Sequence, residues 1–539
     1  MHVDEVRDLD GPNIFLLEPA IKVGFTSQGE EDEIDAARRL RAIVAAEAGE
    51  DADELGPALI AVCVMLHEVA GLPVPAIAVT PLEPDDAFAL AFGWEHRGAA
   101  LALATGLGEL ATGVVADPRA IVAAVADALA HQGPDDAPGV VRDADRRVPI
   151  VGITGTNGKT TSARLLAHVA MQAGRRVGWT STTGVYIDGR CVLDGDYTGP
   201  SGAWRVLGEP GIDLVVLETA RGGILQRGLG YESNDVSIFT NVTPDHIGLH
   251  GVLSVEGLAM VKSTVIAVTR PGGVVVLNAD DPLVAQYGAE VRGRVVVVSR
   301  DAANPRAIAH LAAGGSAVIA ADGWFMACDG ATRTRLLAIA DAPLTLGGLA
   351  QHMVENALGV IAAAIALGFT AGEVSDGLRS FRNDAVSNPG RMNVYELDGV
   401  SIVADYAHNE AGLANLLHVA RGLAGEPGRV TAIIGVAGDR DDDIVAGIGR
   451  IAAELADRVA LRHTLRYLRG RENNDAIDRE LRRGVEAVGS VIAAIHTDEL
   501  TALQQEVALA SRGDVVAIMS VELIPEIRAW LLEQGAMPR

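Results

Sequence analysis

The 539-residue chain is long enough for three or four domains of roughly 150 residues each, so it can bury several cores without disulfides or metal staples. Its 49% hydrophobic and 21% charged residues indicate a globular protein and exclude a disordered one. The net charge of -27 argues against nucleic acid or a membrane surface as a partner, because both bind clustered Lys and Arg.

The N-terminal region, residues 1–145, combines helix-like acidic segments such as 30–47 with Ala-rich and Val-rich stretches, and it ends in a loop-like run at 133–139. We expect a small N-terminal α+β domain here. Four acidic residues among the first ten exclude a secretory signal, and the most apolar stretches, 58–66 and 357–368, are too short to cross a bilayer. The prediction is a cytoplasmic protein with core helices at both stretches.

The three cysteines, Cys63, Cys191 and Cys328, are far apart and match no zinc or redox spacing. They are therefore predicted to be buried thiols in a reducing compartment.

From Val148 onward, short β-branched runs alternate with helix-length segments, which is typical of an α/β fold with a parallel sheet. The expected strands of a central domain, residues 146–386, lie at 148–154, 213–217, 236–240 and 274–277. A second α/β unit follows the loop at 387–390 and is predicted to be a Rossmann-like C-terminal domain, residues 387–539. Its expected strands lie at 400–404, 430–436, 459–461, 491–495 and 515–519.

A phosphate-binding loop is predicted between the first strand of the central domain and the amphipathic segment after it. The residues expected at the nucleotide are Gly155, Thr156, Asn157, Gly158, Lys159, Thr160 and Thr161. Their backbone N–H groups and the helix N-terminus attract phosphate, Lys159 neutralises its charge, and the Thr160 hydroxyl can bind Mg²⁺. The usual GxxxxGK[ST] spacing would place Gly or Ala at 153, where this chain has Ile153, so the loop is a variant.

Two further polar residues follow predicted strands of the same sheet. Glu218 directly follows the strand at 213–217, and His246 lies shortly after the strand at 236–240. The carboxyl ends of parallel strands meet at one edge, so both side chains are expected beside the phosphate loop, where Glu218 can hold Mg²⁺ and His246 a second divalent ion. Lys262, on the predicted helix 255–268, is one of only three lysines among 44 Lys and Arg residues, which favours a role at this site.

Several ordered motifs resemble those of the Mur ligases, and most closely the Mur-ligase half of cyanophycin synthetases. They are GTNGKTT at 155–161, ETARGG at 218–223, NVTPDH at 241–246, NPGR at 388–391 and DYAHN at 405–409. The RDLDGPN segment at 7–13 also resembles the start of the N-terminal domain of cyanophycin synthetases. Their ATP-grasp module has no room between residue 145 and the loop at 152, so the aspartate-adding half-reaction is expected to be absent.

The resemblance implies an ATP-dependent carboxylate–amine ligase that forms an acyl phosphate, which the amine attacks to give an amide, ADP and phosphate. It implies ATP and Mg²⁺ as cofactors, with two divalent sites. Lys159, Glu218, His246 and Lys262 would be the catalytic residues. Thr160, Glu218 and His246 would bind metal, together with Lys262 as a carbamate, which requires a neutral amine that Arg cannot supply.

The resemblance also implies roles for residues of the second half of the chain. Asn356, Arg391 and Asp405 would contact the nucleotide, and His352 lies on the same predicted helix as Asn356. The substrates would contact His408, Asn409, Asp439, Arg440 and Arg471. In cyanophycin synthetases the amine is arginine, which the acidic run at 441–443 would suit, although such a run is as often a solvated helix start.

The expected substrates are an amino acid and an acidic amino-acid or peptide carboxylate. Two alternatives are a nucleotide-binding pseudoenzyme or subunit that partners a separate ATP-grasp ligase, and a P-loop kinase or switch ATPase. The presence of Lys159, Glu218, His246 and Lys262 argues against the pseudoenzyme or subunit. The whole Rossmann-like C-terminal unit argues against a kinase or switch ATPase. The sequence leaves open whether the chain forms a homo-oligomer and what residues 1–145 do.

Overall fold

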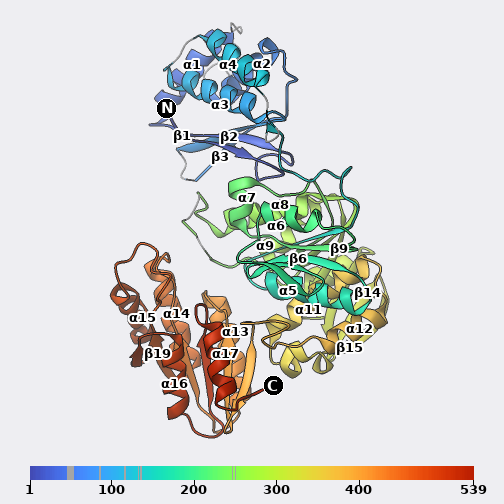
Figure 1. Ribbon diagram of the computed structural model, residues 1–539, viewed down its shortest axis with the longest axis vertical. Helices are drawn as coiled ribbons and strands as arrows, with labels where there is room; N and C mark the ends of the chain where they lie inside the picture. Colours follow the sequence, from blue (N-terminus) through green and yellow to red (C-terminus); the bar gives the residue numbers. More distant parts are fainter. Residues whose placement is uncertain are drawn as a thin grey trace.

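The computed structural model describes residues 1–44, 54–83, 86–114, 117–131, 133, 136–245, 247–248 and 251–539. These residues form three sheets in chain order, each with its own helices. The N-terminal and C-terminal units lie toward opposite ends of the long axis, with the central unit between them (Figure 1). The fold is the mixed α/β architecture expected from the alternation of strands and helices.

The N-terminal unit is an antiparallel sheet in the order β1-β2-β4-β3, covered by helices on the face turned away from the central unit (Figure 1). Its strands are β1 (His2–Leu9), β2 (Ala20–Thr26), β3 (Ile77–Pro81) and β4 (Ala87–Gly93), and its helices are α1 (Glu30–Val44), α2 (Leu55–Val69), α3 (Arg97–Thr112) and α4 (Pro118–Ala130). The predicted acidic helix is α1, and the part of the expected segment at 45–47 lies outside the described residues.

The central unit has one continuous sheet in the order β15-β14-β13-β12-β11-β10-β5-β9-β6-β7-β8. Its strands are β5 (Ile150–Thr154), β6 (Val177–Ser181), β7 (Gly184–Ile187), β8 (Arg190–Asp194), β9 (Leu214–Glu218), β10 (Asn234–Phe239), β11 (Thr269–Asn278), β12 (Arg294–Ser299), β13 (Ser316–Ala321), β14 (Trp324–Asp329) and β15 (Thr332–Ala338). The strands from β6 through β9, β5, β10, β11 and β12 to β13 are parallel, and antiparallel strands extend both edges.

Helices cover both faces of this parallel region, so successive residues of its strands are buried on opposite sides. In β5, Ile150 packs into one apolar cluster, whereas Val151 and Ile153 pack into another. The helices are α5 (Lys159–Gln172), α6 (Pro200–Leu207), α7 (Arg221–Arg227), α8 (Val255–Ala267), α9 (Pro282–Ala285), α10 (Pro305–Ala312), α11 (Gln351–Ala366) and α12 (Ala371–Ser380), with 3₁₀ turns η2 (Gln286–Ala289), η3 (Ile339–Asp341) and η4 (Pro343–Gly348).

The C-terminal unit has the sheet order β20-β19-β18-β21-β17-β16-β22, parallel from β20 to β17 and antiparallel beyond it. Its strands are β16 (Asn393–Leu397), β17 (Val400–Asp405), β18 (Val430–Ile434), β19 (Arg458–Arg462), β20 (Ile492–His496), β21 (Val515–Met519) and β22 (Met537–Pro538). Its helices are α13 (Glu410–Ala424), α14 (Asp442–Leu455), α15 (Asp475–Ala487), α16 (Glu499–Leu509) and α17 (Ile524–Glu533).

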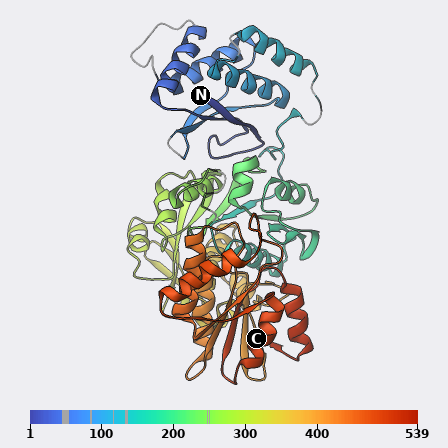
Figure 2. The ribbon, with the colours of Figure 1, turned by 90° about the vertical axis from the view of Figure 1, so that its left-hand side faces the viewer.

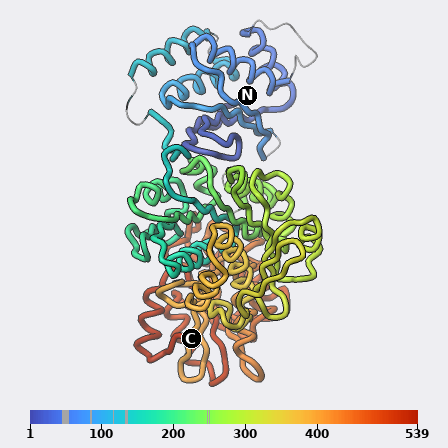
Figure 3. The backbone as a smooth tube through the Cα atoms, turned by 90° about the vertical axis from the view of Figure 1, so that its right-hand side faces the viewer, coloured from blue at the N-terminus to red at the C-terminus, as the bar shows by residue number. Residues whose placement is uncertain are grey.

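The central unit contacts both of its neighbours. On the N-terminal side, Asp10 pairs with Arg227, and the backbone N–H of Leu229 donates to Pro12 O at 2.7 Å. On the other side, the C-terminal unit lies against the central unit, and Figure 2 shows it in front of the central unit. Figure 3 shows the chain passing from the N-terminal unit into the central unit. The two large sheets share an apolar cluster, which includes Leu358 of α11 and Leu416 of α13.

The predicted strands of both α/β units are present, with bounds shifted by a few residues at most, except that β11 begins five residues earlier than expected. Edge hairpins were not predicted, although Asp-Gly turns mark several of them. Asp188-Gly189, Asp322-Gly323 and Asp398-Gly399 join successive strands with positive φ at both residues, as a type I′ turn requires. The edge strands β8 and β15 are largely exposed and lack the apolar runs on which the prediction depended.

The apolar stretches at 58–66 and 357–368 lie mainly within α2 and α11, as predicted. None of the described helices has both the length and the apolar character needed to cross a membrane. Cys63 and Cys328 are buried, but the prediction was wrong for Cys191, which is exposed on the edge strand β8.

Replacing Leu358 with Ala is expected to destabilise the central unit by about 2–5 kcal/mol, because this fully buried side chain would leave a cavity. Ile365→Ala on the same helix removes as many carbon atoms from a side chain that is 38% exposed, so it is expected to cost about 1 kcal/mol or less. Urea unfolding followed by circular dichroism measures both. Equal losses would contradict the packing described for α11.

Candidate functional site

The phosphate loop lies between β5 and α5, at the carboxyl edge of the central sheet. Its backbone is held by the end of β10: Thr156 N–H donates to Asn241 O at 2.8 Å, and Asn157 N–H donates to Asn241 Oδ1 at 2.9 Å. Gly158 has φ +90°, and a Cβ there would lie 2.1 Å from Asn356 Oδ1. Glycine fits this position without backbone strain, whereas a larger residue would also have to displace the Asn356 side chain.

Lys159 begins α5 and curls back over the loop. Its Nζ donates to Gly155 O at 2.9 Å and to Thr156 O at 2.8 Å. Burial lowers the pKa of Lys159, while the carboxylates of Glu218 and Asp245 act in the opposite direction. The ammonium group therefore sits over the backbone cradle where a phosphate would need a positive charge.

Thr160 and Glu218 form a pair of oxygen donors next to the loop. Thr160 Oγ1 donates to Glu218 Oε1 at 3.1 Å, and the Thr182 backbone N–H donates to Glu218 Oε2 at 3.3 Å. Glu218 is 2% exposed, and burial raises the pKa of its carboxyl group. A hydroxyl and a carboxylate are ligands that Mg²⁺ accepts, so these two groups fit a magnesium site.

Lys262, on α8, reaches the same loop from the opposite side. Its Nζ donates to Gly155 O at 2.8 Å, and the residue is 4% exposed. Burial, together with the nearby Lys159, holds the pKa of Lys262 well below its usual range. A neutral amine at this position has the chemistry that carbamylation requires. His246 lies outside the described residues, and the described ones hold no cluster of three His, Cys, Asp or Glu side chains.

A cavity of about 270 Å³ adjoins the loop on the side of α11 and the C-terminal unit. Asn356, Arg391 and Asp405 all line it, as do Asn157, Gly158 and Thr161. The Arg391 guanidinium lies 4.5 Å from the Tyr406 ring centroid and donates to Thr160 Oγ1 at 3.3 Å. Asp405 accepts a hydrogen bond from Met392 N–H at 2.7 Å, and burial raises the pKa of its carboxyl group.

This cavity also contains a charged pair that the sequence analysis missed. Glu355 accepts a hydrogen bond from Asn241 Nδ2 at 3.1 Å and forms an ion pair with Arg300 at 3.4 Å. Burial raises the pKa of Glu355, and it lowers that of the neighbouring His352 to about 4. Glu355 and His352 share the helix of Asn356, but Arg300 comes from the end of β12, which no local pattern connects to the phosphate loop.

A larger cleft, of about 560 Å³, lies between the central and C-terminal units on the other side of the loop. Lys159, Thr160, Glu218 and Lys262 line its inner part. Asp245 and Arg440 form an ion pair across it, and His408 Nε2 lies 3.6 Å from Asp245 Oδ2. Asp245 belongs to the NVTPDH motif, but the sequence analysis selected His246 from that motif as a site residue. The ion pair of Asp245 with the C-terminal unit is therefore known only from the structure.

The other residues that were predicted to contact the substrates are Asn409, Asp439 and Arg471. Asn409 is 1% exposed, caps α13 through Gly412 N–H at 2.8 Å and faces the amide of Asn157 at 3.2 Å. Asp439 accepts a hydrogen bond from Arg469 Nη1 at 2.6 Å. Arg471 does not line the cleft but donates to Gly438 O and Arg440 O, both at 2.9 Å, so it braces the loop that carries Arg440.

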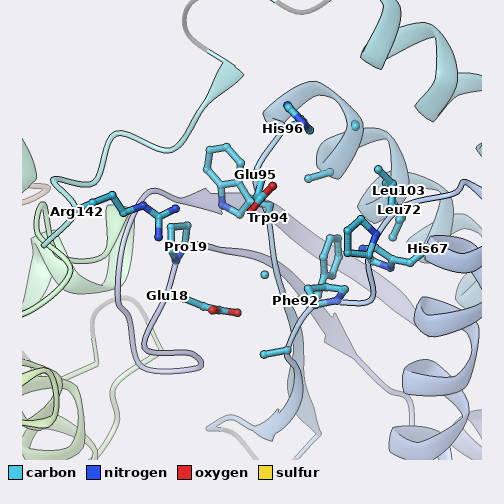
Figure 4. A pocket seen from close by; sticks show the side chains of 16 residues that line it. Glu18, Pro19, His67, Leu72, Phe92, Trp94, Glu95, His96, Leu103 and Arg142 are labelled. Atoms are coloured by element: carbon cyan, nitrogen blue, oxygen red, sulfur yellow. The ribbon is translucent and has the colours of Figure 1, made fainter. Parts of the chain in front are cut away.

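The N-terminal unit contains a separate cavity of about 350 Å³ (Figure 4). Trp94, Phe92 and His67 form much of its wall, and Glu18 lies across from them, with Arg142 at one side (Figure 4). His67 Nδ1 is 2.8 Å from Cys63 O, and burial lowers the pKa of its ring. This cavity and the interdomain cleft have no lining residue in common.

Two parts of the chain match known protein families. Residues 153–364 match the Mur ligase middle domain, and residues 390–521 match the Mur ligase, glutamate ligase domain. The cyanophycin synthetase of Synechocystis sp. is 38% identical over 361 residues, which are 67% of this chain and 40% of that protein. The UDP-N-acetylmuramoyl-L-alanyl-D-glutamate–2,6-diaminopimelate ligase of Geobacter metallireducens is 30% identical over 58% of this chain and 59% of that protein.

Solved structures share the fold at lower identity. E. coli FolC in complex with DHPP and ADP has a TM-score of 0.53 and 20% identity, covering 72% of this chain and 89% of FolC. A bifunctional folylpolyglutamate synthase/dihydrofolate synthase solved with Mn, AMPPNP and L-glutamate has a TM-score of 0.52 and 20% identity, covering 71% and 89%. The share of the chain that each likeness covers is about the size of the two large α/β units together, and both likenesses support the fold.

The ring of His352 is expected to stay neutral down to about pH 4, because burial and the nearby Arg300 disfavour its protonated form. An NMR titration of the histidine ring protons, with the His352 signal assigned from His352→Gln, measures this directly. A His352 midpoint near 6.5, the ordinary value for a histidine, would contradict the enclosed position described here.

Proposed function

This chain belongs to the Mur ligase family, and we propose that it is an ATP-dependent ligase that joins a carboxylate to an amine through an acyl phosphate. The supporting observation is the cluster of Lys159, Thr160, Glu218 and Lys262 at the inner end of a cleft that two domains line. The chain spans 40% of the length of the cyanophycin synthetase that it matches, so the substrates and partners below are part of the proposal.

In this mechanism the phosphate loop holds the β- and γ-phosphates of ATP. Lys159 leaves its two carbonyl partners to contact the phosphates, and the backbone N–H groups at the start of α5 complete the cradle. Thr160 and Glu218 hold Mg²⁺, which when bound neutralises charge on the transferred phosphoryl group. A folylpolyglutamate synthase of the same fold was solved with Mn and AMPPNP, which is in keeping with a nucleotide and a divalent ion here.

Lys262 and His246 are proposed to hold a second divalent ion, with Lys262 carbamylated. The lowered pKa of Lys262 supports this step, since CO₂ reacts with the neutral amine, and an arginine would not do so. The carbamate converts this buried amine into an anionic oxygen ligand. Because Lys262 and Lys159 both bond to Gly155 O, this second site would lie next to the phosphates.

The domains would divide the reaction between them. The central domain, residues 146–386, would activate the acid, the C-terminal domain, residues 387–539, would present the amine, and residues 1–145 would form a separate accessory domain. Arg391, Asp405 and Asn356 would contact the nucleotide, and closure of the two large domains would exclude water from the acyl phosphate. We place the reaction in the cytoplasm, with an amino acid and an acidic amino acid or peptide as substrates.

The first experiment measures phosphate release from ATP and Mg²⁺ across pairs of acids and amines, with products identified by mass. A ligase is expected to form ADP only with a matched pair, together with a product of their summed mass minus water. Lys159→Ala should abolish this turnover, whereas Lys22→Ala should retain it, because Lys22 pairs with Glu5 in the N-terminal sheet. ATP binding without joining of any pair would instead favour a subunit that works with a separate ATP-grasp protein.

Lys262→Arg tests the carbamate. The substitution places a guanidinium at this position and removes the amine that CO₂ modifies, so turnover is expected to fall at least 100-fold while nucleotide binding persists. Binding of a fluorescent ATP analogue and phosphate release, measured on the same preparation, separate the two effects. Turnover at the wild-type rate in Lys262→Arg would remove the carbamate from the mechanism.

A further inference from the structure

Residues 388–391, at the start of the C-terminal domain, lie against the first turn of α5, the helix that follows the phosphate loop. Asn388 is 0% exposed, and its Nδ2 donates to Thr161 Oγ1 at 3.4 Å. The Arg391 guanidinium donates to Thr160 Oγ1 at 3.3 Å. Both hydroxyls belong to the first three residues of α5, so the two domains meet directly beside the phosphate loop.

Arg164, one turn further along α5, contacts the same segment. Its Nη1 donates to Asn388 Oδ1 at 3.2 Å and to Pro389 O at 3.5 Å. Nη2 of the same guanidinium donates to Thr183 Oγ1 at 2.7 Å. Arg164 therefore joins three separate parts of the chain: α5, the segment 388–391 and the turn between β6 and β7.

The turn between β6 and β7 also contacts the proposed magnesium site. Thr182 N–H donates to Glu218 Oε2 at 3.3 Å, and the Thr182 and Thr160 hydroxyl oxygens lie 3.3 Å apart. The neighbouring Thr183 hydroxyl, which accepts the bond from Arg164, lies 3.0 Å from the Tyr186 hydroxyl. One guanidinium is thus bonded both to the turn that holds Glu218 and to the start of the C-terminal domain.

Within the described part of the chain, the Arg164 guanidinium has no carboxylate partner. The residue is 5% exposed, and its acceptors are an amide oxygen, a carbonyl and a hydroxyl. Burial, together with the nearby Arg391, lowers the pKa of Arg164. Burying a charged group is costly unless hydrogen bonds compensate, so an arginine is favoured here by the two segments that its planar fork of donors joins.

The segment 388–391 is in turn fixed to the sheet of the C-terminal domain. Asn393, the first residue of β16, donates from Nδ2 to Asn388 O at 3.0 Å and accepts a hydrogen bond from Gly390 N–H at 2.8 Å. Tyr406 N–H, directly after β17, donates to Gly390 O at 2.7 Å. A displacement of this segment relative to α5 would therefore move β16 and β17 with it.

We propose that Arg164 is a positioning residue that holds the C-terminal domain over the phosphate loop while the acyl phosphate exists. The inference rests on the proposed function, because it assigns a role in that ligase to a residue that lines neither the cavity at α11 nor the interdomain cleft. With the domain held, the amine attacks the acyl carbon, loses a proton and displaces phosphate. Without it, water attacks instead, displaces phosphate and regenerates the carboxylate, so ADP forms without an amide.

The test measures ADP and amide formed by the full chain with the acid–amine pair that the matrix of substrates identifies. The wild-type chain is expected to form one amide per ADP. Arg164→Gln is expected to lower kcat for the amide roughly 10-fold or more and to leave the KM for ATP within about threefold, because Arg164 does not line the nucleotide cavity. It is also expected to form about three or more ADP per amide, as water replaces the amine.

Two further variants complete the test. Arg175→Gln changes an exposed arginine just beyond the other end of α5, so it is the matched control and should keep one amide per ADP. Asn388→Ala removes the main acceptor of Arg164 from the C-terminal side and should give the same excess of ADP as Arg164→Gln. Thermal unfolding followed by circular dichroism shows whether each variant folds, and Asn388→Ala decides the outcome if Arg164→Gln does not.

One amide per ADP in the folded variants would overturn the inference, even if kcat or thermal stability falls, because a packing role lowers stability without changing this ratio. An equal excess of ADP in Arg175→Gln would overturn it as well, since that side chain lies away from the segment 388–391. The proposed function fails separately, when the wild-type chain forms no amide with any acid–amine pair, and the inference then falls with it.

Discussion

Burial of ionisable groups around one short loop is the constraint on which the rest of this structure depends. Lys262 and Glu218 are almost completely enclosed, and Lys159 lies between them on the phosphate loop. Removing such groups from water is costly unless hydrogen bonds and opposite charges compensate. Here the compensation comes from backbone carbonyls of the loop, from Thr160 and from Thr182, so the loop, β9 and α8 must keep their relative positions.

The same constraint explains how the two large domains meet. Asp245 of the central domain is compensated by Arg440 of the C-terminal domain, and Arg391 crosses from its loop to Thr160. Asn157 and Asn409 face each other across the boundary, and a shared apolar cluster lies behind these polar contacts. Opening the domains would break the Asp245–Arg440 ion pair and the Arg391–Thr160 hydrogen bond and would uncover part of the shared apolar cluster, so these contacts hold the closed arrangement together.

The direction in which a charged side chain points decides whether it lines the cleft. Asp442 and Asp443 stand within a few residues of Arg440, yet they face solvent and pair with arginines of their own surroundings. Arg469 is separated from them by the whole of α14 and β19, yet it lines the cleft. The acidic run therefore lies outside the cleft, and the described lining residues of the C-terminal domain include three arginines and no carboxylate.

The sequence by itself determined the alternation of strands and helices, the phosphate loop and the edge of the sheet at which Glu218 lies. These features depend on local patterns: apolar runs, a Gly-rich turn before a helix, and the rule that parallel strands end together. The tertiary structure alone decided that Arg300 pairs with Glu355, that Asp245 pairs with Arg440, that Cys191 is exposed and that Arg469 faces the cleft. Each of these depends on contacts between segments that are distant in sequence. A short stretch of sequence does not show which distant segment it will contact, so its residues alone do not predict such a contact.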